Sequence, residues 1–252
     1  MSVDPTATRA AILCDADGCL FPSEEPAFEA SARVTNRLLR SLGCPQRYTA
    51  ERLRRTTTGR NFRSTAATLA RAHANRALSG WELEGWVDDE RREVTRYLRR
   101  ALHPDREVRE PLWEIGRTHQ LAVVSSSAIS RIDACLEATG MADLFAPELR
   151  FSAEDSLPIP TSKPDPGVYT FTLRALGVPP EGAIAVEDSV PGVTSAVAAG
   201  IRTCGNIHFV PPREREARRM ELAQAGAAAV FASWADLAAS VTQLSSLTSD
   251  AG

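Results

Sequence analysis

Short apolar runs recur along the chain, and segments with helical periodicity separate them. Ala11–Cys14, Leu121–Val124 and Ala183–Val186 are apolar at every position. Runs without polar alternation are typical of strands that are buried on both faces of a parallel sheet. Strands that alternate with helices indicate such a sheet with right-handed crossovers. Further strands are predicted at 145–151, 201–207 and 227–231.

One long segment after the first strand breaks this alternation, because it is helical throughout. In its last helix Leu83, Val94 and Leu98 share one face, and Trp81 and Trp86 are expected in the core of this helical unit. A helical stretch of about eighty residues indicates a separate unit that is inserted after the first strand of the sheet. The sequence therefore predicts a three-layer, Rossmann-like α/β core of residues 1–20 and 103–252 with a helical cap of residues 21–102.

Two carboxylates directly follow the first apolar run. Asp15 and Asp17 stand at the predicted carboxyl end of that strand, and Gly18 lets the chain leave it in conformations closed to other residues. Ligands of open α/β sheets bind at this edge. Aspartate is equally common in tight turns, so these residues alone are consistent with either a catalytic site or a capped turn.

The stretch Asp15-x-Asp17-Gly18-x-Leu20, followed by Ser23-Glu24, resembles the first motif of the haloacid dehalogenase superfamily. Its phosphatase and phosphomutase branch is the most similar, with β-phosphoglucomutase-like and phosphoglycolate phosphatase-like members that carry a helical C1-type cap. Three later stretches resemble the other motifs of the superfamily in the expected order: Ser125 after the second run, Lys163 in Ser162-Lys163-Pro164-Asp165-Pro166, and Glu187-Asp188 after the third run.

The resemblance implies catalytic roles for three residues. Asp15 would be the nucleophile, forming an aspartyl-phosphate that water later cleaves. Asp17 would protonate the leaving oxygen and then deprotonate the water; an acid here favours phosphoryl transfer from oxygen, since dehalogenases and phosphonate hydrolases lack it. Lys163 would keep Asp15 ionised and neutralise charge on the transferring group.

The remaining candidates would bind metal or substrate. Adjacent acids such as Glu187 and Asp188 repel each other unless a cation is near, and hard oxygen ligands suit Mg²⁺. By resemblance, Asp15 and Asp188 coordinate Mg²⁺ through their side chains and Asp17 through its backbone carbonyl, with Glu187 in the outer shell. Ser125 and Ser126 would contact the phosphoryl oxygens, although serines also cap helices. Arg60 and Arg63 are candidates for substrate contacts from the cap.

Composition excludes several other classes of function. Twenty-nine basic and 32 acidic residues give a net charge of −3, which argues against a nucleic-acid partner. No apolar run approaches the ~20 residues of a membrane span, and the first residues lack the features of a signal peptide. The five cysteines include no C-x-x-C pair, as expected for buried thiols in a reducing compartment. We expect a cytoplasmic protein, either a monomer or a homodimer.

Together these observations predict a Mg²⁺-dependent phosphatase for a small phosphorylated metabolite, such as a sugar phosphate or a phosphoglycolate-like compound. A sugar phosphomutase is the first alternative, but β-phosphoglucomutases carry a histidine ten positions after the second aspartate, where this chain has Ala27. Pro22 also stands where the superfamily often has aspartate. The second alternative is a binding or regulatory protein that retains the fold without turnover.

Overall fold

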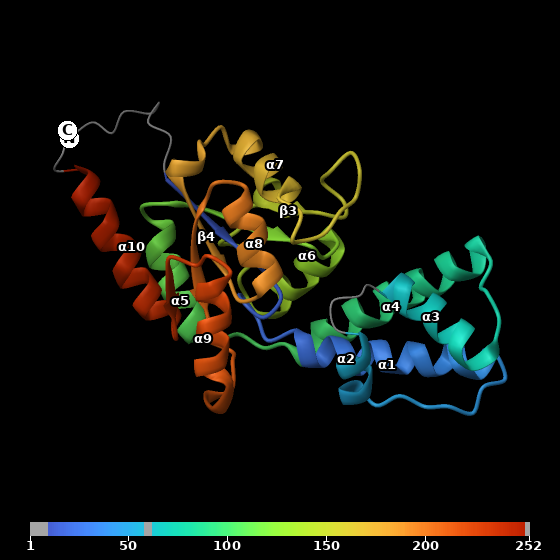
Figure 1. Cartoon of the computed structure of the whole chain (residues 1–252). Helices are drawn as coiled ribbons and strands as arrows, with labels where there is room; N and C mark the ends of the chain where they lie inside the picture. Colours follow the sequence, from blue (N-terminus) through green and yellow to red (C-terminus); the bar gives the residue numbers. More distant parts are fainter. Residues whose placement is uncertain (1–9, 58–61, 250–252) are drawn as a thin grey trace. The chain divides into compact units, whose positions relative to one another are not determined.

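The computed structural model describes residues 10–57 and 62–249 (Figure 1). The chain divides into two compact units: Pro22–Leu102 forms one, and Met1–Phe21 together with His103–Gly252 forms the other. The second of these units holds a six-stranded parallel sheet, and the first is helical. The predicted α/β class with a helical insertion after the first strand is therefore confirmed.

The sheet has the strand order β3-β2-β1-β4-β5-β6, and every neighbouring pair is parallel. Its strands are β1 (Ala11–Cys14), β2 (Gln120–Ser125), β3 (Arg150–Ser152), β4 (Ala183–Glu187), β5 (Arg202–Asn206) and β6 (Ala229–Phe231). Each of the six overlaps a segment that was predicted as a strand. The third is shorter than predicted because Pro147 opens a 3₁₀ turn, Pro147–Leu149, ahead of it, and proline has no N–H for a strand ladder.

The central strand β1 sets the position of the site. All four of its residues are buried, and it pairs with β2 on one side and β4 on the other. Cys14 is in register with Val123 and Val186, and the backbone N–H of Asp15 extends the ladder by donating to the carbonyl of Val186 at 2.9 Å. The residues that follow these strands therefore meet at one edge of the sheet.

Helices pack on the sheet through clusters of buried apolar side chains. In one cluster Leu13, Val124 and Ala185 from the strands pack with Tyr169 and Ala196 from the helices, all of them fully buried. Burial of this apolar surface is the main stabilising contribution to the unit. The helices of this unit are α5 (Arg106–Gly116), α6 (Ile129–Ala138), α7 (Gly167–Leu176), α8 (Val190–Ala198), α9 (Arg215–Gln224) and α10 (Trp234–Ser249).

The helical unit consists of α1 (Glu24–Ser41), α2 (Ala50–Thr57), α3 (Phe62–Ala74) and α4 (Gly80–Ala101). Helix α4 begins with a capping box, in which Ser79 and Glu82 each accept a hydrogen bond from the backbone N–H of the other. Val94 and Leu98 on α4 are buried, as predicted.

The prediction that Trp81 lies in the core of this unit is wrong, because its side chain is 79% exposed. Val94 lies thirteen positions after Trp81, so at about 100° per residue their side chains point roughly 140° apart around the helix axis. Trp86 lies nearer to the buried face and is half-buried. The helical period thus decides burial here more directly than the size of the side chain.

Two further expectations concern the thiols and membrane spans. All five cysteines are buried and none forms a disulfide, as predicted. Within residues 10–57 and 62–249, no helix combines the length and the apolar composition that a membrane span requires.

Leu98 and Trp81 provide a direct test of this helical packing. We expect Leu98→Ala to lower the free energy of unfolding by about 2–5 kcal/mol, because it leaves a cavity at a fully buried position. Trp81→Ala should change it by no more than about 0.5 kcal/mol. Urea denaturation followed by circular dichroism measures both values, and equal losses for the two variants would contradict the packing described here.

Candidate functional site

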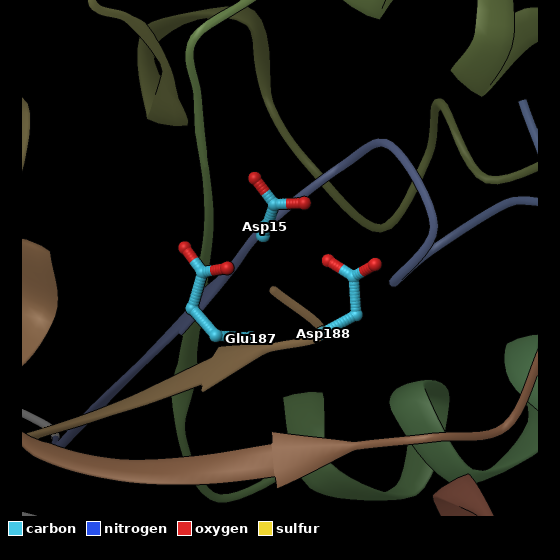
Figure 2. A group of neighbouring side chains, drawn as sticks. All are labelled: Asp15, Glu187 and Asp188. Atoms are coloured by element: carbon cyan, nitrogen blue, oxygen red, sulfur yellow. The ribbon is translucent and has the colours of Figure 1, made fainter. Parts of the chain in front are cut away.

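Three carboxylates converge at the carboxyl edge of the sheet. Asp15 follows β1, Glu187 ends β4 and Asp188 comes next in the chain. One oxygen of each carboxylate lies within 4.8 Å of the other two (Figure 2). The adjacent positions of β1 and β4 in the sheet bring these residues together, although more than half of the chain separates Asp15 from Glu187.

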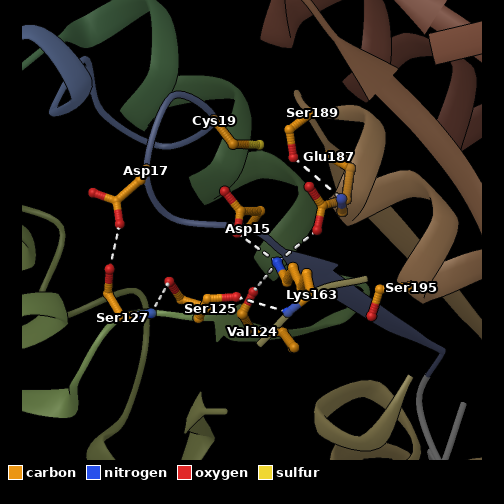
Figure 3. A network of polar contacts seen from close by, with 12 residues as sticks. Asp15, Asp17, Cys19, Val124, Ser125, Ser127, Lys163, Glu187, Ser189 and Ser195 are labelled. Carbon is orange, nitrogen blue, oxygen red and sulfur yellow. Dashed lines mark hydrogen bonds and ion pairs between the residues drawn. The ribbon is translucent and has the colours of Figure 1, made fainter. Parts of the chain in front are cut away.

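Lys163 supplies the positive charge at the centre of this group. Its ammonium group donates to Asp15 Oδ1 and Glu187 Oε1, each at 2.5 Å, and to the backbone carbonyl of Val124 at 2.8 Å (Figure 3). An ammonium group has three donors, and these three acceptors fix its direction. The side chain is only 6% exposed, so water screens these ion pairs weakly.

Tyr169 belongs to the same buried network, and the sequence analysis did not identify it. Its hydroxyl, carried by α7, donates to Glu187 Oε1 at 2.6 Å, and Lys163 Nζ lies 5.1 Å from the centre of its ring. A fully buried tyrosine normally has a hydrogen-bond partner. The available signal was a tyrosine just after Lys163 at the start of a helix, but helical periodicity explains that position by packing alone.

Burial controls the charges of these carboxylates. Burial raises the pKa of Asp15 to about 7, with Lys163 opposing the shift. Burial, together with the negative charges of Asp15 and Glu187, raises the pKa of Asp188 well above its usual range. Burial disfavours the charged form of Lys163, but Asp15 and Glu187 outweigh that effect and raise its pKa. The three carboxylates therefore lie beside the ammonium group of Lys163, which stays charged.

Two oxygens of the group have no protein partner. Glu187 Oε2 and Asp188 Oδ1 are buried, and neither makes a hydrogen bond. A buried carboxylate oxygen without a donor or cation is costly. A divalent cation with oxygen ligands would pair with both, since hard cations such as Mg²⁺ prefer carboxylates. The residues present therefore fit a metal ion.

Two glycines leave room for these side chains. A Cβ atom at Gly192 would lie 1.8 Å from Glu187 Oε2, and one at Gly18 would lie 2.3 Å from Asp188 Oδ2. Gly18 also has a φ of +84°, which residues with a side chain rarely adopt. Each carboxylate thus packs directly against a glycine.

Asp17 has different partners from the other acids. Its Oδ2 accepts a hydrogen bond from the Ser127 hydroxyl at 2.6 Å, and its Oδ1 lies 2.8 Å from Arg131 Nη2. Figure 3 shows the carboxylate directed toward Ser127. Neither Ser127 nor Arg131 emerged from the sequence, because both contact Asp17 from more than 100 positions away. The coordination of metal by the Asp17 carbonyl stays a prediction.

The serines after β2 form hydrogen bonds within the site loops. Ser125 Oγ accepts from the backbone N–H of Ser127, and Ser126 Oγ accepts from the backbone N–H of Lys163, both at 3.1 Å. Ser126 thereby ties the loop after β2 to the loop that carries Lys163. Phosphoryl contacts by Ser125 and Ser126 remain predictions.

Two cap arginines, Arg60 and Arg63, were predicted to contact substrate. Arg60 lies outside the described residues. Arg63 on α3 forms an ion pair with Glu84 on α4, with Nη2 and Oε2 2.6 Å apart, within the helical unit. Their predicted contacts with substrate remain predictions.

Two side chains from the C-terminal part of the chain anchor the loop after Asp15. The carbonyl of Cys19 accepts hydrogen bonds from Trp234 Nε1 at 3.2 Å and from Asn206 Nδ2 at 3.4 Å. Trp234 begins α10 and Asn206 ends β5, and both are buried. These contacts hold the loop that carries Asp17 and Gly18.

Comparison with known proteins places this geometry in a family. Residues 12–206 match the family described as haloacid dehalogenase-like hydrolase. A phosphorylated carbohydrates phosphatase of Thermotoga maritima is 30% identical over 201 residues, which cover 79% of this chain and 85% of that protein. Three CbbY-type relatives, from Arabidopsis thaliana, Cereibacter sphaeroides and Rhodobacter capsulatus, match over only 25%, 17% and 36% of their own lengths.

Solved structures agree with this match. A conserved haloacid dehalogenase-like protein of unknown function from Agrobacterium tumefaciens is 26% identical, with a TM-score of 0.67 over 94% of this chain and 99% of that one. CbbY from Rhodobacter sphaeroides in complex with phosphate is 25% identical, with a TM-score of 0.66 over 91% and 96%. As the four sequence motifs predicted, the chain belongs to the haloacid dehalogenase-like hydrolase family.

Proposed function

We propose that the protein is a phosphatase that hydrolyses a small phosphorylated metabolite, of the sugar phosphate or phosphoglycolate type, through an aspartyl-phosphate on Asp15. The observation that carries this proposal is the buried contact between Asp15 and Lys163, beside two carboxylate oxygens that lack a partner. The Thermotoga maritima relative is named for phosphorylated carbohydrates, and the Rhodobacter sphaeroides structure holds phosphate. Both support a phosphorylated substrate.

The reaction would proceed in two displacements. Lys163 holds Oδ1 of Asp15, and we assign the other oxygen, Oδ2, as the nucleophile. A new bond forms between Oδ2 and phosphorus, the ester bond breaks, and Asp17 gives its proton to the leaving oxygen. Asp17 then takes a proton from water, whose oxygen attacks phosphorus and releases phosphate and the Asp15 carboxylate.

Asp15 and Asp188 would hold Mg²⁺ through their side chains, with Glu187 in the outer shell and Asp17 contributing its backbone carbonyl. When bound, the ion neutralises negative charge on the transferring phosphoryl group. Lys163 supplies positive charge beside the nucleophile whether or not the ion is bound, because it forms ion pairs with both Asp15 and Glu187. Tyr169 adds a neutral hydrogen bond to Glu187 and so helps to orient it without changing the charge of the site.

Asp15→Asn tests the nucleophile. We expect this variant to lose about 10³-fold or more of the wild-type rate of phosphate release from p-nitrophenyl phosphate, and chelation of the metal to suppress wild-type activity. Asp143→Asn is the matched control, because Asp143 pairs with Arg109 on an exposed surface. Activity retained by Asp15→Asn would remove Asp15 as the nucleophile. Absence of metal-dependent hydrolysis in the wild type would favour a binding protein.

The raised pKa values predict how metal binding depends on pH. The folded-state pKa of Asp15, about 7, exceeds the usual ~3.9, so the metal-free protein should lose stability as pH rises between these values. Protons then compete with Mg²⁺ at pH 6 but much less at pH 8. We expect Mg²⁺ to raise the thermal unfolding midpoint more at pH 8 than at pH 6, and an equal increase at both would contradict this.

Gly192→Ala tests the packing of Glu187. The added methyl group would overlap the Glu187 carboxylate, so we expect kcat to fall by about 10-fold or more and the Mg²⁺ concentration for half-maximal activity to rise. Gly85→Ala is the control, since a Cβ atom there meets nothing within 4 Å. The assignment of Glu187 to the site fails if Gly192→Ala folds normally and keeps both kinetic values.

A further inference from the structure

Both oxygens of Asp17 are held by side chains outside the four sequence motifs. Arg131 Nη2 lies 2.8 Å from Oδ1, and the Ser127 hydroxyl donates to Oδ2 at 2.6 Å. The Arg131 and Asp17 side chains are 24% and 26% exposed. Charge-assisted hydrogen bonds of this length are stronger than neutral ones, and partial burial keeps solvent from screening them fully.

The two partners are themselves fixed to the framework. The backbone N–H of Ser127 donates to Ser125 Oγ, which ties Ser127 to the end of β2. Arg131 lies in the first turn of α6, and the backbone N–H of Ile129, at the start of that helix, donates to Asp155 Oδ2 at 2.7 Å. Asp17 is therefore held from two directions, by a serine of the loop after β2 and by an arginine whose helix is anchored at its start.

A fixed direction is what the proposed role of Asp17 requires. Proton transfer to the leaving oxygen depends on alignment, and small misplacements of a catalytic group are costly. The side chain of Asp17 rotates about two bonds, and the residue lies beyond the end of β1, in an isolated bridge with Phe21 rather than in a strand of the sheet. The backbone alone therefore leaves its carboxylate underdetermined, and the contacts from α6 and the Ser127 loop remove that freedom.

We propose that Arg131 is a positioning residue that orients Asp17 for proton transfer to the leaving group. Arg131 holds Oδ1, so the proton to be transferred is carried by Oδ2, whose partner, the Ser127 hydroxyl, can accept as well as donate a hydrogen bond. This inference rests on the proposed phosphatase function. Arg131 acts through Asp17 and takes no part in the bonds that form or break. Because assistance by an acid matters most when the leaving oxygen is a poor leaving group, the loss of Arg131 should affect esters unequally.

Two aryl phosphates distinguish this unequal effect from a general loss of activity. Phenyl phosphate has a more basic leaving oxygen than p-nitrophenyl phosphate and is otherwise close to it in shape. In Arg131→Met, we expect kcat/KM to fall by about 10-fold or more for phenyl phosphate and several-fold less for p-nitrophenyl phosphate. The ratio kcat/KM is the correct measure because it reports formation of the phosphoenzyme, the step in which the leaving oxygen takes its proton.

Three further variants complete the experiment. Arg109→Met breaks another arginine–aspartate ion pair, with Asp143 at 2.6 Å. This variant should leave kcat/KM unchanged for both esters. Arg131→Lys should recover part of the loss, and Ser127→Ala should produce a smaller loss with the same preference, which keeps the test decisive if Arg131→Met folds poorly.

The outcomes separate the inference from the function on which it rests. Equal losses for both esters in Arg131→Met and Ser127→Ala, with hydrolysis by the wild type, would overturn the role of Arg131 and leave the phosphatase function intact. If the wild type hydrolyses neither ester at any Mg²⁺ concentration, the proposed function fails and the role of Arg131 fails with it.

Discussion

One buried ammonium group makes the arrangement of the site possible. Lys163 contacts Asp15, Glu187 and the carbonyl of Val124, and it is the cation that the protein itself places among the converging carboxylates. If Lys163 were lost, the buried carboxylates of Asp15 and Glu187 would lose the ammonium group that pairs with both of them, and buried charges that lack partners are strongly destabilising. The loop after β3 must therefore bring this residue under the ends of β1 and β4 before the site can exist.

The site remains short of positive charge even with Lys163 in place. Glu187 Oε2 and Asp188 Oδ1 lack protein partners, and the pKa values of Asp15 and Asp188 are raised. Such an arrangement lowers stability, yet it creates the conditions for binding a divalent cation and an anionic phosphoryl group. The glycine at position 192 maintains this crowding, because any larger residue would displace the Glu187 carboxylate.

The architecture could be predicted from the sequence because runs of apolar residues indicate strands that are buried on both faces of a sheet. The three purely apolar runs became β1, β2 and β4, the adjacent strands at the centre of the sheet, so the acids after them had to meet at one edge. The family followed from the order of motifs. The individual roles of Asp15, Asp17 and Lys163 remain predictions that the geometry supports.

What the sequence did not reveal depends on contacts between distant segments. Tyr169 has the spacing of an ordinary core residue, and its hydrogen bond to Glu187 follows from how α7 lies on the sheet. Arg131 resembles any other helix arginine until the fold brings it to Asp17. Trp81 shows the opposite error, since its size suggested burial while the helical period placed it in solvent. Periodicity therefore predicts elements well and side-chain partners poorly.

The central claim is that Asp15 carries the phosphoryl group between the two displacements. Rapid acid quench during turnover, followed by mass spectrometry of the peptide that contains residues 11–24, tests it directly. The account predicts a transient increase by the mass of one phosphoryl group, located on Asp15 and removed by hydroxylamine, as expected of an acyl phosphate. Turnover with the phosphoryl group on another residue, or with none on the protein at any time, would contradict it.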